Sequence, residues 1–390
     1  MIRNSVLNMK QILELYIHIP FCIRKCRYCD FLSAPQDEET RERYVEALLR
    51  EISAHRDKRE SYEVSTVFFG GGTPSVLSPS QVKRIFEALQ DSFAIHPDAE
   101  ISMEANPGTV TEEKLRTYRA CGINRISFGL QSADNEELRL LGRIHTYEEF
   151  EENFRLARKC GFDNINVDLM SAIPRQTMDS LERTLAKVIS LGPEHISAYS
   201  LIVEEGTPFF NLYGERGPLE SELPGEEEER QMYYRTKEML AGAGYQRYEI
   251  SNYATQGKEC RHNLGYWERA NYLGLGLGSS SLMDNVRFRN TEDLEFYLKN
   301  SGSPKSIQRE RAELSVKEQM EEFIFLGLRK MEGISAEEFK ACFHRDIKEV
   351  YENQIDHLMR EGLLWRRGDR IFLTEKGIDV SNCVFAEFLE

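Results

Sequence analysis

Three cysteines, Cys22, Cys26 and Cys29, lie within eight residues of one another in the spacing Cys-x3-Cys-x2-Cys. A disulfide framework would be spread through a small secreted chain, so clustered thiols in a chain of 390 residues suggest a metal or redox function instead. Three thiolates around a 4Fe–4S cube leave one iron without a protein ligand, and an open iron can bind a substrate directly. The other five cysteines are scattered singly, at Cys121, Cys160, Cys260, Cys342 and Cys383.

A zinc site is the alternative interpretation of the same residues. Structural zinc prefers four protein ligands, usually as two closely spaced pairs. No fourth cysteine or histidine follows the triplet at zinc-finger spacing, so zinc would need a distant residue such as Cys260. The three-thiolate spacing, with the aromatic Tyr28 directly before the last cysteine, favours the iron–sulfur interpretation.

The elements that must position this triplet alternate along the first two thirds of the chain. Short β-rich runs are each followed by a longer stretch of helical periodicity, at intervals of roughly 30 to 40 residues, which is the length of a β-α-β unit. This alternation predicts a parallel sheet that is closed or nearly closed. The runs are Leu15–Pro20, Ser65–Gly70, Ile101–Asn106, Arg125–Gln131, Ile165–Leu169 and Ile196–Val203.

Polar residues or glycines stand at the carboxyl ends of these runs, where the chemistry of parallel α/β barrels collects. The second run ends in Gly70–Thr73 (GGGT), whose glycines would let backbone groups approach a ligand closely. Glu104, at the end of the third run, is placed to accept a hydrogen bond from a ribose hydroxyl, and Arg143 is placed to pair with a carboxylate. Asp168 lies between apolar neighbours in the fifth run. Any one of these can be an ordinary satisfied polar residue, but together they predict a ligand cradle.

The segment IHIPFCIRKCRYCDF resembles the cysteine motif of the radical S-adenosylmethionine superfamily. More narrowly, it resembles the oxygen-independent coproporphyrinogen III oxidase family and its heme-chaperone branch, over roughly residues 14 to 380. The resemblance implies an α/β fold with an open partial (β/α)6 barrel of the TIM type and the cluster at its mouth. A smaller C-terminal domain, helical and winged-helix-like, is expected to follow.

Changes in composition and in the order of the predicted helices and strands along the chain predict three domains. The barrel core is expected in residues 1–205, an extension of the barrel in 206–308, and the C-terminal domain in 309–390. The acidic run Glu226–Glu229 is expected to open a solvated helix, because acids are favoured at a helix N-terminus. A helix-helix-hairpin order with Gly368-Asp369 at the turn underlies the winged-helix prediction.

The resemblance also implies which residues hold cofactors. Cys22, Cys26 and Cys29 would ligate a 4Fe–4S cluster, whose electron cleaves S-adenosylmethionine to methionine and a 5′-deoxyadenosyl radical. Some relatives hold two S-adenosylmethionine molecules, so the matching positions need not serve one ligand, and no catalytic residue is assigned. The positions implied to contact S-adenosylmethionine are Tyr16, Tyr28, Gly71, Gly72, Thr73, Glu104, Gln131, Arg143 and Asp168.

Two features resemble the heme-chaperone branch rather than the oxidases. Phe31 stands where the oxidase pattern has a further cysteine, and the arm before the first strand is short. His262, Tyr266 and Trp267 match the HNxxYW motif, which is associated with heme binding in that branch. Neutral imidazole is a common axial ligand of heme iron. Two alternatives stay open: a packed structural histidine, and iron ligation by Cys260.

The implied function is a heme chaperone that binds heme, a 4Fe–4S cluster and S-adenosylmethionine, and delivers heme to respiratory membrane hemoproteins. An electron donor for the cluster is expected as a further partner, and homodimerisation stays open. The alternative is an oxygen-independent oxidase that decarboxylates the propionates of coproporphyrinogen III. A radical enzyme acting on RNA is a third interpretation, but 65 acidic against 50 basic residues disfavour a nucleic-acid partner.

Location is predicted as cytoplasmic, with peripheral association at the membrane. No apolar run approaches the roughly 18 residues that a spanning helix requires. The first 14 residues, MIRNSVLNMKQILE, lack the apolar core of a secretory signal.

Overall fold

The computed structural model describes residues 10–389, so most of the N-terminal segment considered for a secretory signal lies outside the described part. Each of the predicted β-rich runs is a strand, and neighbouring strands in this series pair in parallel. The sixth strand ends at Ser200, earlier than predicted. The strands are β1 (Gln11–Ile19), β2 (Tyr62–Gly71), β3 (Ile95–Ala105), β4 (Arg125–Gln131), β5 (Ile165–Ser171) and β6 (His195–Ser200).

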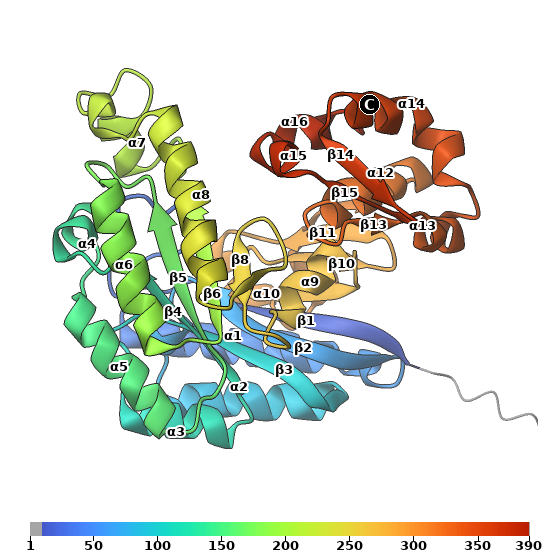
Figure 1. Cartoon of the computed structure of the whole chain (residues 1–390). Helices are drawn as coiled ribbons and strands as arrows, with labels where there is room; N and C mark the ends of the chain where they lie inside the picture. Colours follow the sequence, from blue (N-terminus) through green and yellow to red (C-terminus); the bar gives the residue numbers. More distant parts are fainter. Residues whose placement is uncertain (1–9, 390) are drawn as a thin grey trace, which may run out of the picture.

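Helices follow the strands and cover the outer face of the sheet (Figure 1). A polar side chain caps the N-terminus of each: Ser78 caps α2 in a full capping box with Gln81, and Thr146 caps α5 with Glu149. These caps satisfy backbone N–H groups that a helix leaves unpaired at its start. The helices are α1 (Glu38–Ala54), α2 (Pro79–Ser92), α3 (Glu112–Ala120), α4 (Asn135–Leu141), α5 (Tyr147–Lys159) and α6 (Met178–Leu191).

The two faces of β1 show how the barrel separates core from site. Leu13, Leu15 and Ile17 are fully buried in the main hydrophobic core together with residues of α1. The side chains of Glu14, Tyr16 and His18 alternate with these and point to the opposite face, as the two-residue period of a strand requires. That inner face carries polar and aromatic side chains, and both of the cavities described below open beside it.

Residues 206–313 extend the barrel sheet at both edges, with β12 at one end and β7 at the other, so β12 runs across the predicted boundary at 308/309. β9 (Tyr272–Leu275) pairs in parallel with β1, and an antiparallel series β10 (Ser280–Met283), β11 (Val286–Asn290) and β12 (Gln308–Glu313) follows. The sheet is therefore open, as predicted. At the other edge lie β8 (Asn252–Ala254) and β7 (Gln246–Arg247).

The extension also contains the helix predicted at the acidic run, since α8 begins at Glu226. The boundaries at 205/206 and 308/309 stay predictions. The helices of this segment are α7 (Pro208–Tyr213), α8 (Glu226–Gly242), α9 (Arg261–Trp267), α10 (Leu294–Asn300) and α11 (Pro304–Ile307). The short 3-10 helix η3 (Glu220–Glu222) also lies here, whereas η1 (Arg56–Arg59) and η2 (Pro74–Val76) belong to the barrel core.

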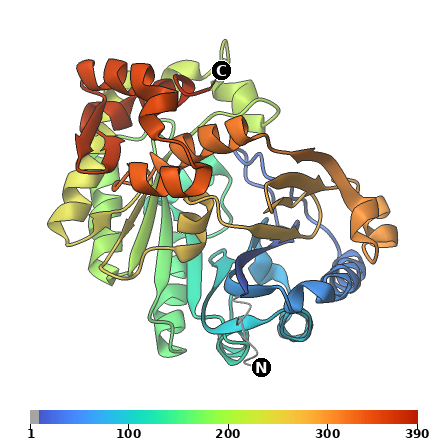
Figure 2. The same cartoon turned by 90° about the vertical axis from the view of Figure 1, so that its right-hand side faces the viewer.

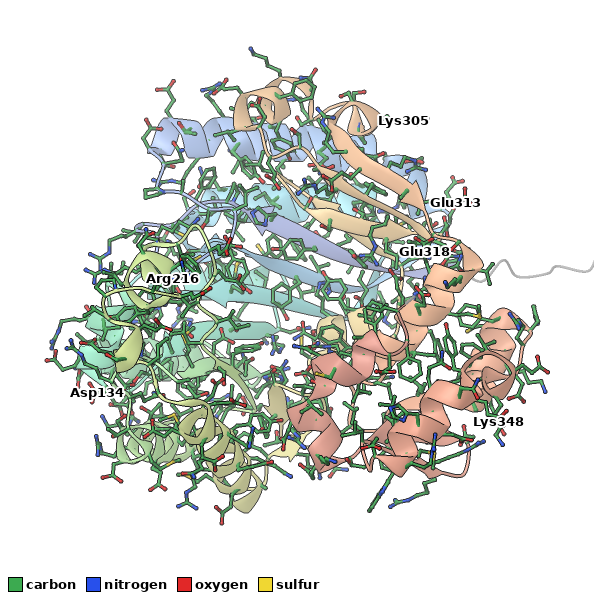
Figure 3. The ribbon with its side chains drawn as sticks, turned by 90° about the horizontal axis from the view of Figure 1, so that it is seen from above. Asp134, Arg216, Lys305, Glu313, Glu318 and Lys348 are labelled. Atoms are coloured by element: carbon green, nitrogen blue, oxygen red, sulfur yellow. The ribbon has the colours of Figure 1, made fainter. Side chains whose placement is uncertain are left out.

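The C-terminal segment packs around its own hydrophobic core, which includes Ile324, Phe339 and Ile355. It stands beside the barrel, next to β10, β11 and α9 (Figures 1 and 2). Glu313 and Glu318, labelled in Figure 3, mark where the sheet extension passes into it. Its elements are α12 (Val316–Gly327), β13 (Ile334–Ser335), α13 (Ala336–Phe343), α14 (Ile347–Arg360), β14 (Leu364–Arg367), β15 (Arg370–Leu373), α15 (Glu375–Asp379) and α16 (Ser381–Ala386).

The hairpin β14–β15 turns at Gly368-Asp369 and pairs with β13 into a three-stranded sheet. Helices, a small wing and a further helical segment thus follow in the predicted order. Within residues 10–389, none of the helices combines the length and apolar composition needed to cross a membrane.

Candidate functional site

The cysteine loop after β1 and the carboxyl ends of β2 to β5 converge on one cavity of about 130 Å³, called here the cysteine cavity. All three cysteines of the triplet line it. So do most of the residues implied to contact S-adenosylmethionine: Tyr28, Gly71, Gly72, Thr73, Glu104, Gln131, Arg143 and Asp168. The polar strand ends therefore meet, as their positions in the sequence predicted.

Tyr16 is the exception among these residues, because it lines a neighbouring cavity instead. It still lies close to the first one: a Cβ atom at Gly70 would lie 3.1 Å from the Tyr16 ring and 3.2 Å from Glu104 Oε2. The Tyr16 hydroxyl lies 3.1 Å from His18 Nδ1. Tyr16 and His18 thus form a wall that backs onto the cysteine cavity.

A chain of hydrogen bonds connects two of the cysteines through the strand ends. Thr73 Oγ1 donates to Cys22 Sγ at 3.5 Å and accepts from Asn106 Nδ2 at 2.7 Å. Arg143 donates to Asn106 Oδ1 at 2.6 Å and to Cys26 Sγ at 3.5 Å. Asn106 was missed as a site residue by the sequence analysis, although it directly follows the third strand. These bonds fix the cysteine loop relative to the barrel mouth.

The glycines at the end of β2 are required by close packing against the cysteine loop. A Cβ atom at Gly72 would lie 2.6 Å from the Phe21 carbonyl oxygen, and Gly72 N–H donates to Ile19 O at 2.9 Å. Gly71 has φ +109°, where a side chain is strained, and a Cβ atom there would meet the His18 ring at 2.5 Å. The loop and the glycine segment are therefore one packed unit.

The electrostatics of the cysteine cavity suit a cationic ligand with carboxylate and amino groups. Burial, reinforced by nearby Asp168, raises the pKa of Glu104 to about 8. Burial also raises the pKa of the Cys29 thiol, so cluster binding there would release its proton. Burial by itself would lower the pKa of Arg143, but the nearby Tyr28 and Cys26 outweigh this effect. The net pKa is raised, and the guanidinium stays charged. These donors and carboxylates fit an iron–sulfur cluster and S-adenosylmethionine.

A second and larger cavity, of about 560 Å³, lies on the other side of the Tyr16–His18 wall. It is called here the aromatic cavity because aromatic and aliphatic side chains dominate its lining. Two residues of the HNxxYW motif, Tyr266 and Trp267 on α9, form part of that lining. Other elements contribute Leu32, Tyr272, Gly278, Ser279, Ser280, Leu282, Arg287, Glu322, Phe325 and Leu326.

His262 does not line the aromatic cavity but lies behind it, 1% exposed. Its Nδ1 lies 2.6 Å from Thr66 Oγ1 and its Nε2 lies 3.0 Å from the Tyr266 hydroxyl. The ring stacks on Phe68 at a centroid distance of 5.1 Å. Burial lowers the pKa of His262 to about 3, so the ring is neutral. Iron ligation by His262 stays a prediction. It would require the ring to break its hydrogen bond with either Thr66 or Tyr266.

Cys260, the alternative ligand, is also buried, and it lies outside both cavities. Its Sγ is 3.5 Å from Glu100 Oε1, and the Glu100 carboxylate also accepts from the backbone N–H groups of Arg261 and His262. Cys260 therefore stands at the beginning of α9 and not beside the cysteine loop, where the zinc interpretation would have needed it.

Gly265 lets α9 approach the barrel interior closely. A Cβ atom at Gly265 would lie 2.0 Å from Glu14 Oε1, so no other residue fits without moving that carboxyl. Glu14 Oε2 is 3.7 Å from His262 Nδ1. Burial, with a contribution from Glu100, raises the pKa of Glu14 to about 9. The Glu14 side chain is accordingly protonated at neutral pH.

This raised pKa predicts a pH-dependent effect of Glu14→Gln on stability. The unfolded chain releases the Glu14 proton near the ordinary pKa of 4.5, whereas the folded chain keeps it up to about 9. Folding stability of the natural chain should therefore fall with rising pH in this window, by at most about 1.4 kcal/mol per pH unit from this group. Glu14→Gln should gain stability relative to the natural chain from pH 5 to pH 9. Urea unfolding at several pH values measures this, and a constant difference would refute it.

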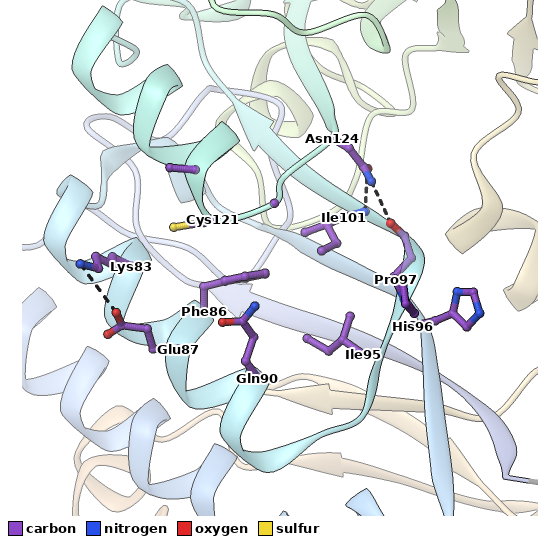
Figure 4. A pocket seen from close by; sticks show the side chains of 13 residues that line it. Lys83, Phe86, Glu87, Gln90, Ile95, His96, Pro97, Ile101, Cys121 and Asn124 are labelled. Carbon is purple, nitrogen blue, oxygen red and sulfur yellow. Dashed lines mark hydrogen bonds and ion pairs between the residues drawn. The ribbon is translucent and has the colours of Figure 1, made fainter.

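A third cavity, of about 380 Å³, lies between α2, α3 and the beginning of β3 (Figure 4). Lys83 and Glu87 form an ion pair on one side of it, and Cys121 lines another side. Its lining contains none of the residues that the sequence analysis singled out for cofactors. The candidate site therefore consists of the cysteine cavity and the aromatic cavity.

Comparison with protein-family models gives two matches. Residues 16–188 match the radical SAM superfamily, and residues 314–380 match the HemN C-terminal domain. Among solved structures, coproporphyrinogen III oxidase (HemN) of Escherichia coli, described as a radical SAM enzyme, matches with a TM-score of 0.85. That match covers 97% of this chain and 90% of the other at 23% identity, so it shows the fold.

Curated relatives match over nearly the full length. The heme chaperone HemW of Lactococcus lactis subsp. lactis is 37% identical, with 96% of each chain covered. HemW of Bacillus subtilis is 36% identical (96% of this chain, 98% of the relative), and HemW of Escherichia coli is 35% identical (97% and 98%). With its radical SAM core and the HemN-type C-terminal domain, the chain belongs to the heme chaperone HemW family.

Proposed function

We propose that this chain is a heme chaperone that carries a 4Fe–4S cluster with S-adenosylmethionine and delivers heme to respiratory hemoproteins. One observation carries the proposal: the cysteine cavity and the aromatic cavity lie back to back, with Tyr16 and His18 between them. A cofactor site and a site for a large apolar ring would thus share one wall. The names of the relatives, heme chaperone HemW, support the same assignment.

The cofactor residues of this proposal are those of the cysteine cavity. Cys22, Cys26 and Cys29 would hold the cluster, and the backbone at Gly71 and Gly72 would receive the methionine end of S-adenosylmethionine. When bound, the reduced cluster supplies one electron for cleavage of the sulfonium. The protein's own part is to position the ligand and to hold the Arg143 guanidinium at the cavity, where it donates to Cys26 Sγ and to Asn106 Oδ1. Release of 5′-deoxyadenosine measures whether cleavage occurs.

Glu104→Gln should weaken S-adenosylmethionine binding about tenfold, the effect of losing one hydrogen bond to a charged group. Only the ionised carboxylate accepts from both ribose hydroxyls, and the pKa of Glu104 is about 8. Affinity of the natural chain should therefore rise with pH up to about 8 and then level off. Calorimetric titration between pH 6 and 9 measures both effects. A pH profile that Glu104→Gln leaves unchanged would exclude this role.

The proposed cargo is heme, and the proposed recipients are respiratory hemoproteins in the membrane. Delivery to such recipients would bring this chain to the membrane surface as a peripheral partner. A one-electron donor for the cluster completes the set of proposed partners.

Two parallel incubations test the proposal against the oxidase alternative. In the first, the reconstituted, reduced protein is mixed with coproporphyrinogen III and S-adenosylmethionine. In the second, the same protein is mixed with heme. We expect one heme bound per chain and no protoporphyrinogen. Formation of protoporphyrinogen at catalytic turnover would contradict a chaperone-only function.

A further inference from the structure

Three charged side chains meet where the C-terminal segment touches the aromatic cavity. Glu322 on α12 accepts a hydrogen bond from Arg287 Nη2 at 2.6 Å and from Arg269 Nε at 2.9 Å. Arg287, on β11, also approaches the Tyr272 hydroxyl at 3.4 Å. Arg287 and Glu322 both line the cavity. This group is called here the arginine pair with Glu322.

The group carries one positive charge in excess, because two arginines share one glutamate. Arg269 and Glu322 have side chains only 10% and 11% exposed, whereas the Arg287 side chain is 42% exposed. Partly buried charge is weakly screened, so the excess positive charge of this group beside an apolar cavity favours an anionic group on the ligand that enters. Arginine also pairs with carboxylates in a fixed two-pronged geometry.

We propose that the aromatic cavity binds the porphyrin ring and that Arg287 pairs with one of its propionate carboxylates. This inference rests on the function proposed above and assigns its ligand site. Tyr16, Tyr266, Trp267 and Tyr272 offer aromatic surface to the ring. The cavity's volume of about 560 Å³ is in the range of pockets that bury most of a ligand of this size.

The arrangement allows Arg287 to change partner at little cost. Glu322 keeps Arg269 when Arg287 turns to the ligand, so no buried carboxylate is left without a partner. Arg269 itself is held by Asn285 Oδ1 at 3.2 Å. The exchange leaves the ion pair between α12 and the barrel extension in place.

The site joins the two halves of the chain. Phe325 and Leu326 reach the cavity from α12, so the C-terminal segment covers a ring that the barrel side holds. A tetrapyrrole would therefore touch β1, α9, the β10–β11 hairpin and α12 at once. This is a role for the C-terminal segment that cofactor binding in the cysteine cavity does not require.

The test compares three porphyrins on the cluster-loaded, full-length protein: heme, metal-free protoporphyrin, and the protoporphyrin dimethyl ester, which lacks free carboxylates. Arg287→Ala should weaken binding of the first two by about ten- to a hundredfold, as expected for loss of a charged hydrogen-bond pair. It should leave the affinity for the ester unchanged. Arg289→Ala is the matched control, since Arg289 lies on the same strand and pairs with Glu292 and Glu310 outside the cavity.

Equal affinities of Arg287→Ala and the natural chain for heme would overturn the inference and leave the proposed function standing. Absence of heme binding by the natural chain would instead refute the proposed function. A second variant, Leu326→Trp, fills the cavity from α12 and should abolish binding of all three porphyrins while S-adenosylmethionine still binds. Of the two tryptophans of the natural chain, Trp267 lines the cavity, so a Trp365→Phe background reports ring binding by the natural chain and by Arg287→Ala through quenching of Trp267 fluorescence. Binding to Leu326→Trp is followed by the absorption of the porphyrin.

Discussion

Replacing Cys26 by serine should abolish the iron–sulfur cluster. Cys26 lines the cysteine cavity and accepts a hydrogen bond from Arg143, and a serine hydroxyl is a poor ligand for iron in such a cluster. After anaerobic reconstitution, the variant should lose the visible charge-transfer absorption and on the order of the full iron and sulfide content. Binding of S-adenosylmethionine should weaken as well, because the open iron of the cluster is expected to bind the amino and carboxylate groups of the ligand's methionine part.

Cys342→Ser is the control for this experiment. Cys342 is exposed and lies on α13 of the C-terminal segment, so its replacement should leave the cluster intact. Full retention of iron, sulfide and absorption in Cys26→Ser would show that other residues hold the metal.

Replacing His262 by alanine should lower affinity for heme and, because the ring also holds the cavity wall in place, for metal-free porphyrin as well. The change removes a fully packed ring and leaves the hydroxyls of Thr66 and Tyr266 without a shared partner. Loss of the buried ring and these hydrogen bonds should destabilise the protein by on the order of 2 to 5 kcal/mol. Tyr266 and Trp267 would then lose their fixed position in the wall of the aromatic cavity.

The comparison of the two porphyrins separates positioning from ligation. A positioning histidine affects ring binding whether or not iron is present, whereas an iron ligand affects heme alone and changes its Soret band. His357→Ala, an exposed histidine on α14, is the control for general effects on stability. Unchanged affinity for metal-free porphyrin with a tenfold loss for heme would establish ligation instead.

The sequence predicted the parallel strands and the site at their ends because both depend on local pattern. The run at Ile101–Asn106 alternates apolar and polar residues, and the run at Ser65–Gly70 is rich in β-branched and aromatic residues. Each ends in residues that a continuing strand would not favour. Parallel strands bring their carboxyl ends to one edge, so Glu104 and Asp168 had to meet. The prediction that the sheet is open was likewise confirmed by the order of its strands.

The remaining parts of the site depend on contacts between distant segments, for which the chain has no local signal. His262 pairs with Thr66 across 196 residues, so the motif identified the histidine without showing that both its nitrogens are engaged. Glu322 meets Arg287 and Arg269 from 35 and 53 residues away. Asn106 had a signal, since it follows Glu104 at the same strand end, but an asparagine before a proline is equally typical of a turn.

The central claim is that one chain holds heme beside its cluster and passes it on. The most direct test mixes heme-loaded protein with an apo-hemoprotein and follows the recipient's Soret band, with cluster-loaded natural protein and with Cys26→Ser. We predict stoichiometric transfer from the cluster-loaded protein and markedly slower or incomplete transfer from the variant. Transfer at the rate of free heme, or no transfer from the cluster-loaded protein, would contradict it.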